Sequence, residues 1–100
     1  MPYIKQEDRK KFDDILNLFQ QKSGKLLQEM DRSFLVGELN YLISRILHIW
    51  VHHNGLCYTT LNSAIGVLEC CKQELYRQIV APYEDKKKEE NGSVSHLDGK

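Results

Sequence analysis

One stretch of the sequence could bind an anionic, nucleotide-like ligand along a single helix face. Glu38, Tyr41, Arg45, His48 and His52 lie at offsets of 0, 3, 7, 10 and 14 residues. At about 100° per residue, an α-helix brings this spacing onto one narrow stripe. Guanidinium and imidazole groups can hold phosphates, and a phenol ring can stack on a base. The alternative interpretation is an ordinary solvated face, because charged side chains are mostly exposed in folded proteins.

A second polar stripe with similar chemistry follows nearer the C-terminus. Its members at helical spacing are Asn62, Glu69, Gln73, Tyr76 and Arg77. Arg77 could contact an anion, while Glu69 and Gln73 could accept hydrogen bonds from a base or a ribose. The alternative is again a solvated face, stabilised by a Glu69–Lys72 pair and a Gln73–Arg77 pair.

Lys72 departs from the polar stripe of its own segment. The helical count places it among the apolar residues Leu61, Ile65, Leu68 and Ile79. Its methylene stem could pack on these residues while its ammonium group reaches water. Alternatively, Lys72 could lie at a subunit interface and face an anion.

The histidines do not complete a metal-site motif. His48 and His52 have the i, i+4 spacing of helical zinc ligands, but Ile49 stands where H-E-x-x-H requires glutamate. His53 is also close in sequence, and only Cys57, by loop reach, could add a further ligand. Because a zinc site needs three or four ligands, we expect no bound metal.

A helical, Mg²⁺-dependent nucleotide hydrolase would need several carboxylates on facing helices. Glu38, Glu69 and Glu74 are the candidates, but the paired E-x-x-E and E-x-x-D motifs are absent from the segments that carry them. Cys70 and Cys71 are typical of small apolar packing groups, and no partner marks a cysteine or serine as a nucleophile. We therefore expect a protein that is not an enzyme and that has no cofactor.

The first element expected to position these residues is a helix from about Gln6 to Gln21. Its apolar stripe, which we expect to be buried, follows i, i+3, i+4, i+7 spacing and comprises Phe12, Ile15, Leu16 and Phe19. Ser23 and Gly24 should end this helix, and residues 25–30 should add one or two helical turns.

A second helix is predicted from about Ser33, as its N-cap, to His53. Apolar residues cover more than half of its circumference, namely Leu35, Val36, Leu39, Leu42, Ile43, Ile46, Leu47, Trp50 and Val51. A helix this apolar is buried on more than one side, so we expect part of the arc, with Trp50 at its centre, to contact another subunit. Asn54 and Gly55 should stop the helix, with Gly55 in a left-handed conformation.

The third helix is expected to begin at Thr59 or Thr60, either of which could cap it. Pro82 should end or kink it, because proline disfavours an α conformation at Ala81, and a helical piece from Tyr83 to Glu90 should follow. Residues 1–90 would then form a single helical domain, and residues 91–100 a mobile, polar C-terminal tail. The predicted fold is all-α: a small bundle of about three main helices, the long C-terminal one kinked near Pro82, assembled as a homo-oligomer.

The composition is typical of one globular domain. The chain has 100 residues, of which 41% are hydrophobic and 28% charged, and its formal net charge is zero. Zero net charge argues against nucleic acid and anionic membranes as partners. The longest apolar stretch, residues 42–51, is too short and too polar to span a bilayer. Three cysteines and the lack of a signal peptide favour reduced thiols in a cytoplasm.

Several motifs resemble those of a known family. In order along the chain they are MPYIKQEDR, GELNYLISRILH, GVLEC, ELYR, APYEDKK and ENG. They resemble a widespread family of short, functionally uncharacterised proteins of bacteria, phages and prophages. In that family a Gly-Asp follows the last asparagine, whereas Gly92 is followed here by Ser93. The resemblance implies a bacterial host cell as the setting.

Small phage accessory proteins often act stoichiometrically, and this context favours a non-catalytic function. We expect an anti-defence sponge that sequesters a cyclic nucleotide or ADP-ribose-type immune signal. The alternatives are a homo-oligomeric interaction or structural protein without a small ligand, and the metal-dependent hydrolase. The predicted ligand-binding residues, which would converge if the two polar stripes line one pocket, are Asn40, Tyr41, Arg45, Asn62, Glu69, Lys72, Tyr76 and Arg77.

Overall fold

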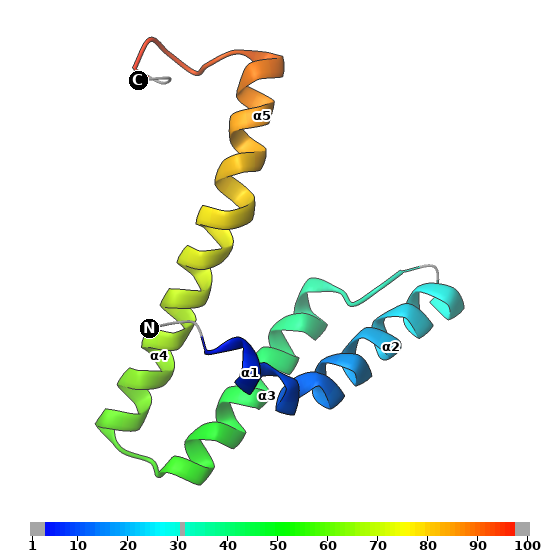
Figure 1. Ribbon diagram of the computed structural model, residues 1–100, viewed down its shortest axis with the longest axis vertical. Helices are drawn as coiled ribbons and strands as arrows, with labels where there is room; N and C mark the ends of the chain where they lie inside the picture. Colours follow the sequence, from blue (N-terminus) through cyan, green and yellow to red (C-terminus); the bar gives the residue numbers. More distant parts are fainter. Residues whose placement is uncertain (1–3, 31, 98–100) are drawn as a thin grey trace. The chain divides into compact units, whose positions relative to one another are not determined.

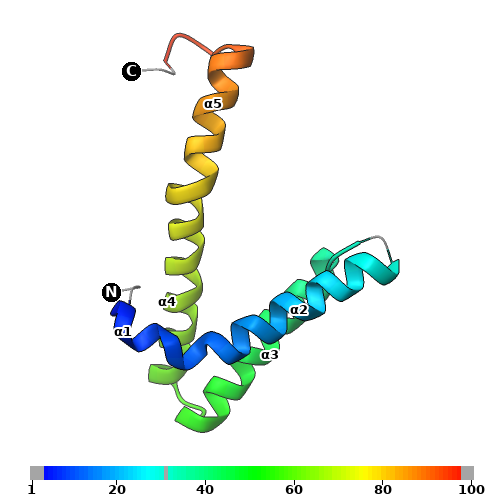
Figure 2. The ribbon, with the colours of Figure 1, turned by 45° about the vertical axis from the view of Figure 1, so that its right-hand side comes forward.

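The computed structural model describes residues 4–30 and 32–97, and every regular element within them is helical (Figures 1 and 2). This confirms the predicted all-α class with three main helical segments. The chain divides into two compact units, one ending at Leu61 and the other beginning at Asn62. In chain order the elements are α1 (Gln6–Arg9), η1 (Lys10–Phe12), α2 (Asp13–Met30), α3 (Val36–Asn54), α4 (Tyr58–Leu75), η2 (Tyr76–Val80) and α5 (Ala81–Asn91).

The first unit contains a helical hairpin, in which α2 and α3 run side by side in opposite directions (Figures 1 and 2). The prediction that Ser23 and Gly24 end the first helix is wrong, because α2 continues to Met30. An isolated glycine destabilises a helix by only about 1 kcal/mol, and the residues that follow it are good helix formers. The Lys25–Glu29 ion pair, at 3.8 Å, also supports this last part of α2.

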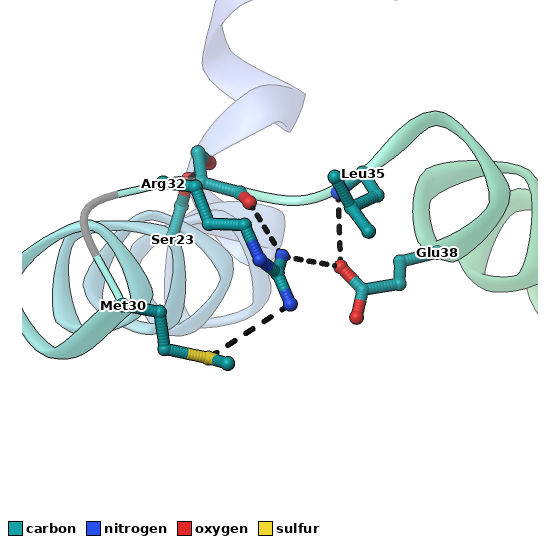
Figure 3. Close-up of polar contacts among 6 residues, drawn as sticks. Ser23, Met30, Arg32, Leu35 and Glu38 are labelled. Atoms are coloured by element: carbon teal, nitrogen blue, oxygen red, sulfur yellow. Dashed lines mark hydrogen bonds and ion pairs between the residues drawn. The ribbon is translucent and has the colours of Figure 1, made fainter.

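The N-terminus of α3 is capped by a carboxylate that comes from within the helix (Figure 3). Glu38 Oε1 accepts hydrogen bonds from the Leu35 backbone N–H at 2.9 Å and from Arg32 Nη1 at 3.0 Å. Ser33 is therefore not the N-cap as predicted, and its hydroxyl instead bonds to that of Ser23. Leu35 occupies the N-cap position, although its side chain has no hydrogen-bond acceptor. The Glu38 carboxylate supplies the capping interaction instead, so the helix begins after Leu35 and later than expected.

The structure confirms the prediction that Asn54 and Gly55 end α3. Gly55 has φ +99°, a conformation that residues with a Cβ rarely adopt, and its N–H donates to the Val51 carbonyl at 2.8 Å. The chain then turns into α4 within three residues, at Tyr58. Neither Thr59 nor Thr60 precedes α4 as a cap, because both lie inside its first turn.

From Tyr58 to Asn91 the chain is continuously helical through α4, η2 and α5. Pro82 does not end the helix, and the irregularity lies just before it, where η2 is a π-helix and the Ala81 N–H donates to the Tyr76 carbonyl. Proline has no N–H, and its ring displaces the carbonyl four residues earlier. A wider turn accommodates this displacement without breaking the helix. After α5, Gly92 has φ +89°, and the division into a domain over residues 1–90 and a mobile tail stays a prediction.

Very little of the single chain is buried. Among the described residues, Ala64 is the one buried hydrophobic residue and Thr60 the one buried polar residue. The stripe on the first helix, expected to be buried, is exposed, and Trp50 on α3 retains 40% of its accessible surface. The expected burial of this stripe is therefore wrong for the described residues, because too few side chains lie near it to cover it.

Candidate functional site

The polar stripe of α3 brings an arginine and a tyrosine into direct contact. Arg45 Nη1 donates a hydrogen bond to Tyr41 Oη at 3.2 Å, and its guanidinium carbon lies 6.0 Å from the centroid of the Tyr41 ring. The pair is four residues apart, so one helical turn places the two side chains on the same face. The contact orders a long cationic side chain beside an aromatic ring.

Next to this pair, α3 lines a shallow hollow of about 430 Å³ with Arg45, His48, Ile49, His52 and His53. The rings of His52 and His53 meet edge to face, with their centroids 5.3 Å apart. Three members of the predicted stripe therefore share one surface hollow. Ile49 and His53 were not predicted as part of it, although each adjoins a stripe residue in the sequence and could have been found on that basis.

The charge of this α3 surface is not neutralised within the described part of the chain. No acidic side chain among residues 4–30 and 32–97 forms an ion pair with Arg45, His48 or His52. Glu38, the acid of the predicted stripe, is held instead by the Leu35 N–H and by Arg32 at the start of α3. These two hydrogen bonds lower the pKa of the Glu38 carboxyl below its ordinary value.

Lys72 and Arg77, the two cations predicted to bind a ligand from α4 and η2, are by contrast paired with neighbouring acids. Lys72 Nζ lies 3.7 Å from Glu69 Oε2, which confirms the expected Glu69–Lys72 pair. Arg77 Nη2 lies 3.3 Å from both carboxylate oxygens of Glu74. Gln73 donates to Glu69 Oε2 at 3.0 Å, and this bond, followed by the charge of Lys72, lowers the pKa of the Glu69 carboxyl.

The other predicted ligand residues have local partners or lie free on the surface. Asn40 accepts a hydrogen bond from Ser44 at 3.1 Å, Tyr76 Oη donates to Glu84 at 3.3 Å, and Asn62 is exposed. Tyr76 also lines a second hollow of about 650 Å³, together with Glu84, Asp85, Lys87, Lys88, Asn91, Gly92 and Val94. Two acids and two lysines line this hollow, so it offers no uniform charge to a ligand. The convergence of the two polar stripes on one pocket stays a prediction.

A thiol that sequence reasoning assigned only to a loop lies at the start of α4. Cys57 Sγ is 3.5 Å from the hydroxyl oxygen of Thr60, which is buried and lies 3.4 Å from the Asn54 carbonyl oxygen. Hydrogen bonds from the Thr60 side chain and from the backbone N–H groups of Thr60 and Thr59 lower the pKa of the Cys57 thiol. The spacing of Cys57 and Thr60, from N-cap to third helical residue, is the signal that could have revealed this arrangement.

Comparison with known proteins places the chain in a family. Residues 1–94 match a family described as a domain of unknown function, DUF6899. The chain belongs to this family. No curated protein and no solved structure matches this DUF6899 chain.

The acidic residues of this DUF6899 chain do not assemble into a group suited to a metal ion. Within the residues that the structure describes, no three or more His, Cys, Asp or Glu side chains could hold one. Glu38, Glu69 and Glu74, the carboxylates of the hydrolase hypothesis, each contact a basic side chain of a nearby residue. No helix in the described ranges is long and apolar enough to cross a membrane.

Proposed function

We propose that this protein is a non-catalytic homo-oligomer that binds an anionic nucleotide on the polar stripe of α3. The observation that carries the proposal is Arg45, which is ordered by Tyr41 and has no acidic partner among the described residues. A guanidinium in this state can donate two parallel hydrogen bonds to a phosphate. His48 and His52 add further donors in the adjacent hollow, and Tyr41 adds a ring face for a base.

The ligand class that we propose is a cyclic nucleotide, held stoichiometrically in the manner of a phage anti-defence sponge. The pairing of Glu38, Glu69 and Glu74 with neighbouring cations favours binding over metal-dependent hydrolysis, since their oxygens already have partners. The family resemblance supplies the phage and bacterial-host setting, and the chemistry of the α3 stripe supplies the preference for an anion with an aromatic base.

The exposed apolar faces support self-association. On α3 alone, Leu39, Ile43, Ile46, Ile49 and Trp50 all retain at least 40% of their accessible surface. A large exposed apolar surface of this kind marks a protein contact. The same observation favours a second candidate function, a homo-oligomeric interaction protein that takes no small ligand.

Titration calorimetry with a panel of cyclic mononucleotides, cyclic dinucleotides and cyclic ADP-ribose separates these functions. We expect wild type to bind at least one of them and to release it unchanged after denaturation. Arg45→Ala should bind more weakly, whereas the control Lys25→Ala, which removes one exposed charge from α2, should bind like wild type. No binding by wild type would favour the interaction protein, and recovery of a cleaved ligand would favour the hydrolase.

A further inference from the structure

The apolar residues of α4 and η2 repeat with the spacing of a coiled coil. Alternating steps of four and three residues separate six positions, of which five are apolar and one is a lysine. They are Leu61, Ile65, Leu68, Lys72, Leu75 and Ile79. Written as a heptad, leucine occupies every d position and isoleucine occupies two of the three a positions. We refer to these six residues as the α4 seam.

The residue types of the α4 seam specify a particular kind of pairing. Isoleucine at a with leucine at d favours two parallel strands, because each side-chain shape fits the hole that it meets in that geometry. Lys72 occupies the central a position, and a single polar residue there sets the register of the two strands at some loss of stability. Its place among apolar residues is thereby explained.

The contacts of Lys72 fit this role. Its ammonium group lies 3.7 Å from Glu69, which occupies an e position at the margin of the seam. The charge is therefore balanced at the edge, while the methylene stem can lie along the apolar surface. In an in-register parallel pair the two lysines share one layer, and each can reach a glutamate. A shift by one heptad would place each ammonium against isoleucine instead.

The α4 seam is not covered by any regular element of its own unit, the one that begins at Asn62. Ile65 retains 65% of its accessible surface, Leu75 55% and Ile79 61%. In the unit that begins at Asn62, the regular elements are parts of one continuous helix, and a single helix cannot cover its own stripe. Its last residue, Ile79, lies within η2, where the helix widens before Pro82.

The exposed area of the chain is large enough to accommodate a second copy. The chain exposes 9203 Å², whereas a compact monomer of 11.7 kDa exposes about 5,900 Å². The difference is about 3,300 Å², and one partner in an obligate dimer buries ~1,000–2,500 Å². A second copy on the α4 seam can account for part of this difference.

We propose that two copies of this protein pair through the α4 seam as a parallel, in-register, two-stranded coiled coil. Lys72 of both copies lies in the central layer and sets the register. The inference rests on the self-association proposed above, and it adds the surface, the number of strands and their direction. It does not depend on a nucleotide ligand.

The first test compares two variants that differ only in their place on α4. Ile65→Lys adds a charge on the seam, and Val67→Lys adds the same charge two residues away, off the seam, at a side chain that is 52% exposed. Light scattering should show that Ile65→Lys reduces the mass of the assembly to half or less, while Val67→Lys keeps it. If the assembly keeps its mass with Ile65→Lys, the α4 seam is not its interface, although self-association still holds. A monomeric wild type at micromolar concentration would overturn self-association as well.

Disulfide cross-linking tests the direction, and it holds even if Ile65→Lys fails to fold. In a background with Cys57, Cys70 and Cys71 changed to serine, Leu68→Cys should cross-link to itself on oxidation, because equivalent d residues adjoin in a parallel pair. Val67→Cys should not. Cross-linking only when Leu68→Cys is mixed with Lys72→Cys would show an antiparallel pair and overturn the proposal. The proposal would also be overturned if the background protein is a dimer but Leu68→Cys forms no cross-link at all.

Discussion

At the scale of single residues, the cations of this protein differ in whether an acid already neutralises them. Arg32 contacts Glu38 at 3.0 Å, Lys72 contacts Glu69 and Arg77 contacts Glu74. Arg45 instead contacts a neutral phenol within the described part of the chain. A phosphate would have to displace a carboxylate from the paired cations, whereas at Arg45 it need only share the guanidinium with Tyr41.

We expect Arg45→Ala to weaken binding of a cyclic nucleotide by about 10- to 100-fold, ~1.5–3 kcal/mol, the range for a hydrogen bond to a charged group. Arg45→Lys should recover only part of the affinity, because an ammonium cannot form the two parallel bonds of a guanidinium. Calorimetry measures both variants, and circular dichroism checks that their helices are intact. Equal affinities in wild type and Arg45→Ala would remove Arg45 from the binding site.

The thiol of Cys57 should react with a disulfide reagent at a lower pH than an ordinary cysteine. Its pKa is lowered by the hydroxyl of Thr60 and by N–H groups at the start of α4, so the reactive thiolate persists to lower pH. The measurement is the rate of reaction against pH in a background with Cys70 and Cys71 changed to serine. Thr60→Val should move this profile to higher pH, and an unmoved profile would show that the hydroxyl contributes nothing.

At the scale of elements, the cap of α3 depends on one ionised carboxylate. Glu38 accepts from Leu35 and Arg32, and its folded-state pKa is therefore lowered. A group whose pKa is lower in the folded state stabilises the fold above its unfolded pKa, and this stabilisation is lost as the pH falls through the folded pKa. The stability of α3 should therefore decline in acid as Glu38 takes up a proton.

Glu38→Gln should lower the Tm by a few degrees at neutral pH. Glutamine can still accept from the Leu35 N–H, but it carries no charge for Arg32. The difference in Tm between wild type and variant should vanish at low pH, where Glu38 is protonated. Glu29→Gln is the matched control, since its exposed ion pair with Lys25 within α2 contributes little. A Tm difference that stays constant with pH would contradict the carboxylate cap.

At the scale of the whole molecule, the main feature is how many apolar side chains stay exposed, because association with further copies would bury them. Phe12, Phe19 and Trp50 each retain at least 40% of their accessible surface, and Ala64 is the one buried hydrophobic residue of the described ranges. A chain with so small a core gains little from the hydrophobic effect by itself. Its stability should therefore depend on its concentration, as it does in obligate oligomers.

Trp50, the single tryptophan, should report this association directly. In the single chain it is 40% exposed, and coverage of the α3 arc in an assembly should shift its emission to shorter wavelength. Dilution below the dissociation constant should then move the emission to longer wavelength, in step with the loss of mass by light scattering. Emission that stays constant while the mass falls would place Trp50 outside every interface.

Local sequence determined the helical segments, the faces that carry polar and apolar residues, and the stop at Gly55. These features depend on interactions between residues three or four positions apart and on backbone conformations that only glycine adopts readily. The same local spacing placed Tyr41, Arg45, His48 and His52 on one stripe, and the structure brings the last three to one hollow.

Tertiary structure decided which of these groups are already partnered. Arg32, in the loop before α3, pairs with Glu38 of the predicted stripe, and Arg45 has no acidic partner in the described ranges. The sequence could not rank Arg32 above Arg45 as the partner of Glu38, because the energy of an ion pair depends on three-dimensional distance. The apolar faces were likewise identifiable from periodicity alone, but whether one chain can cover them depends on how much neighbouring surface its fold provides.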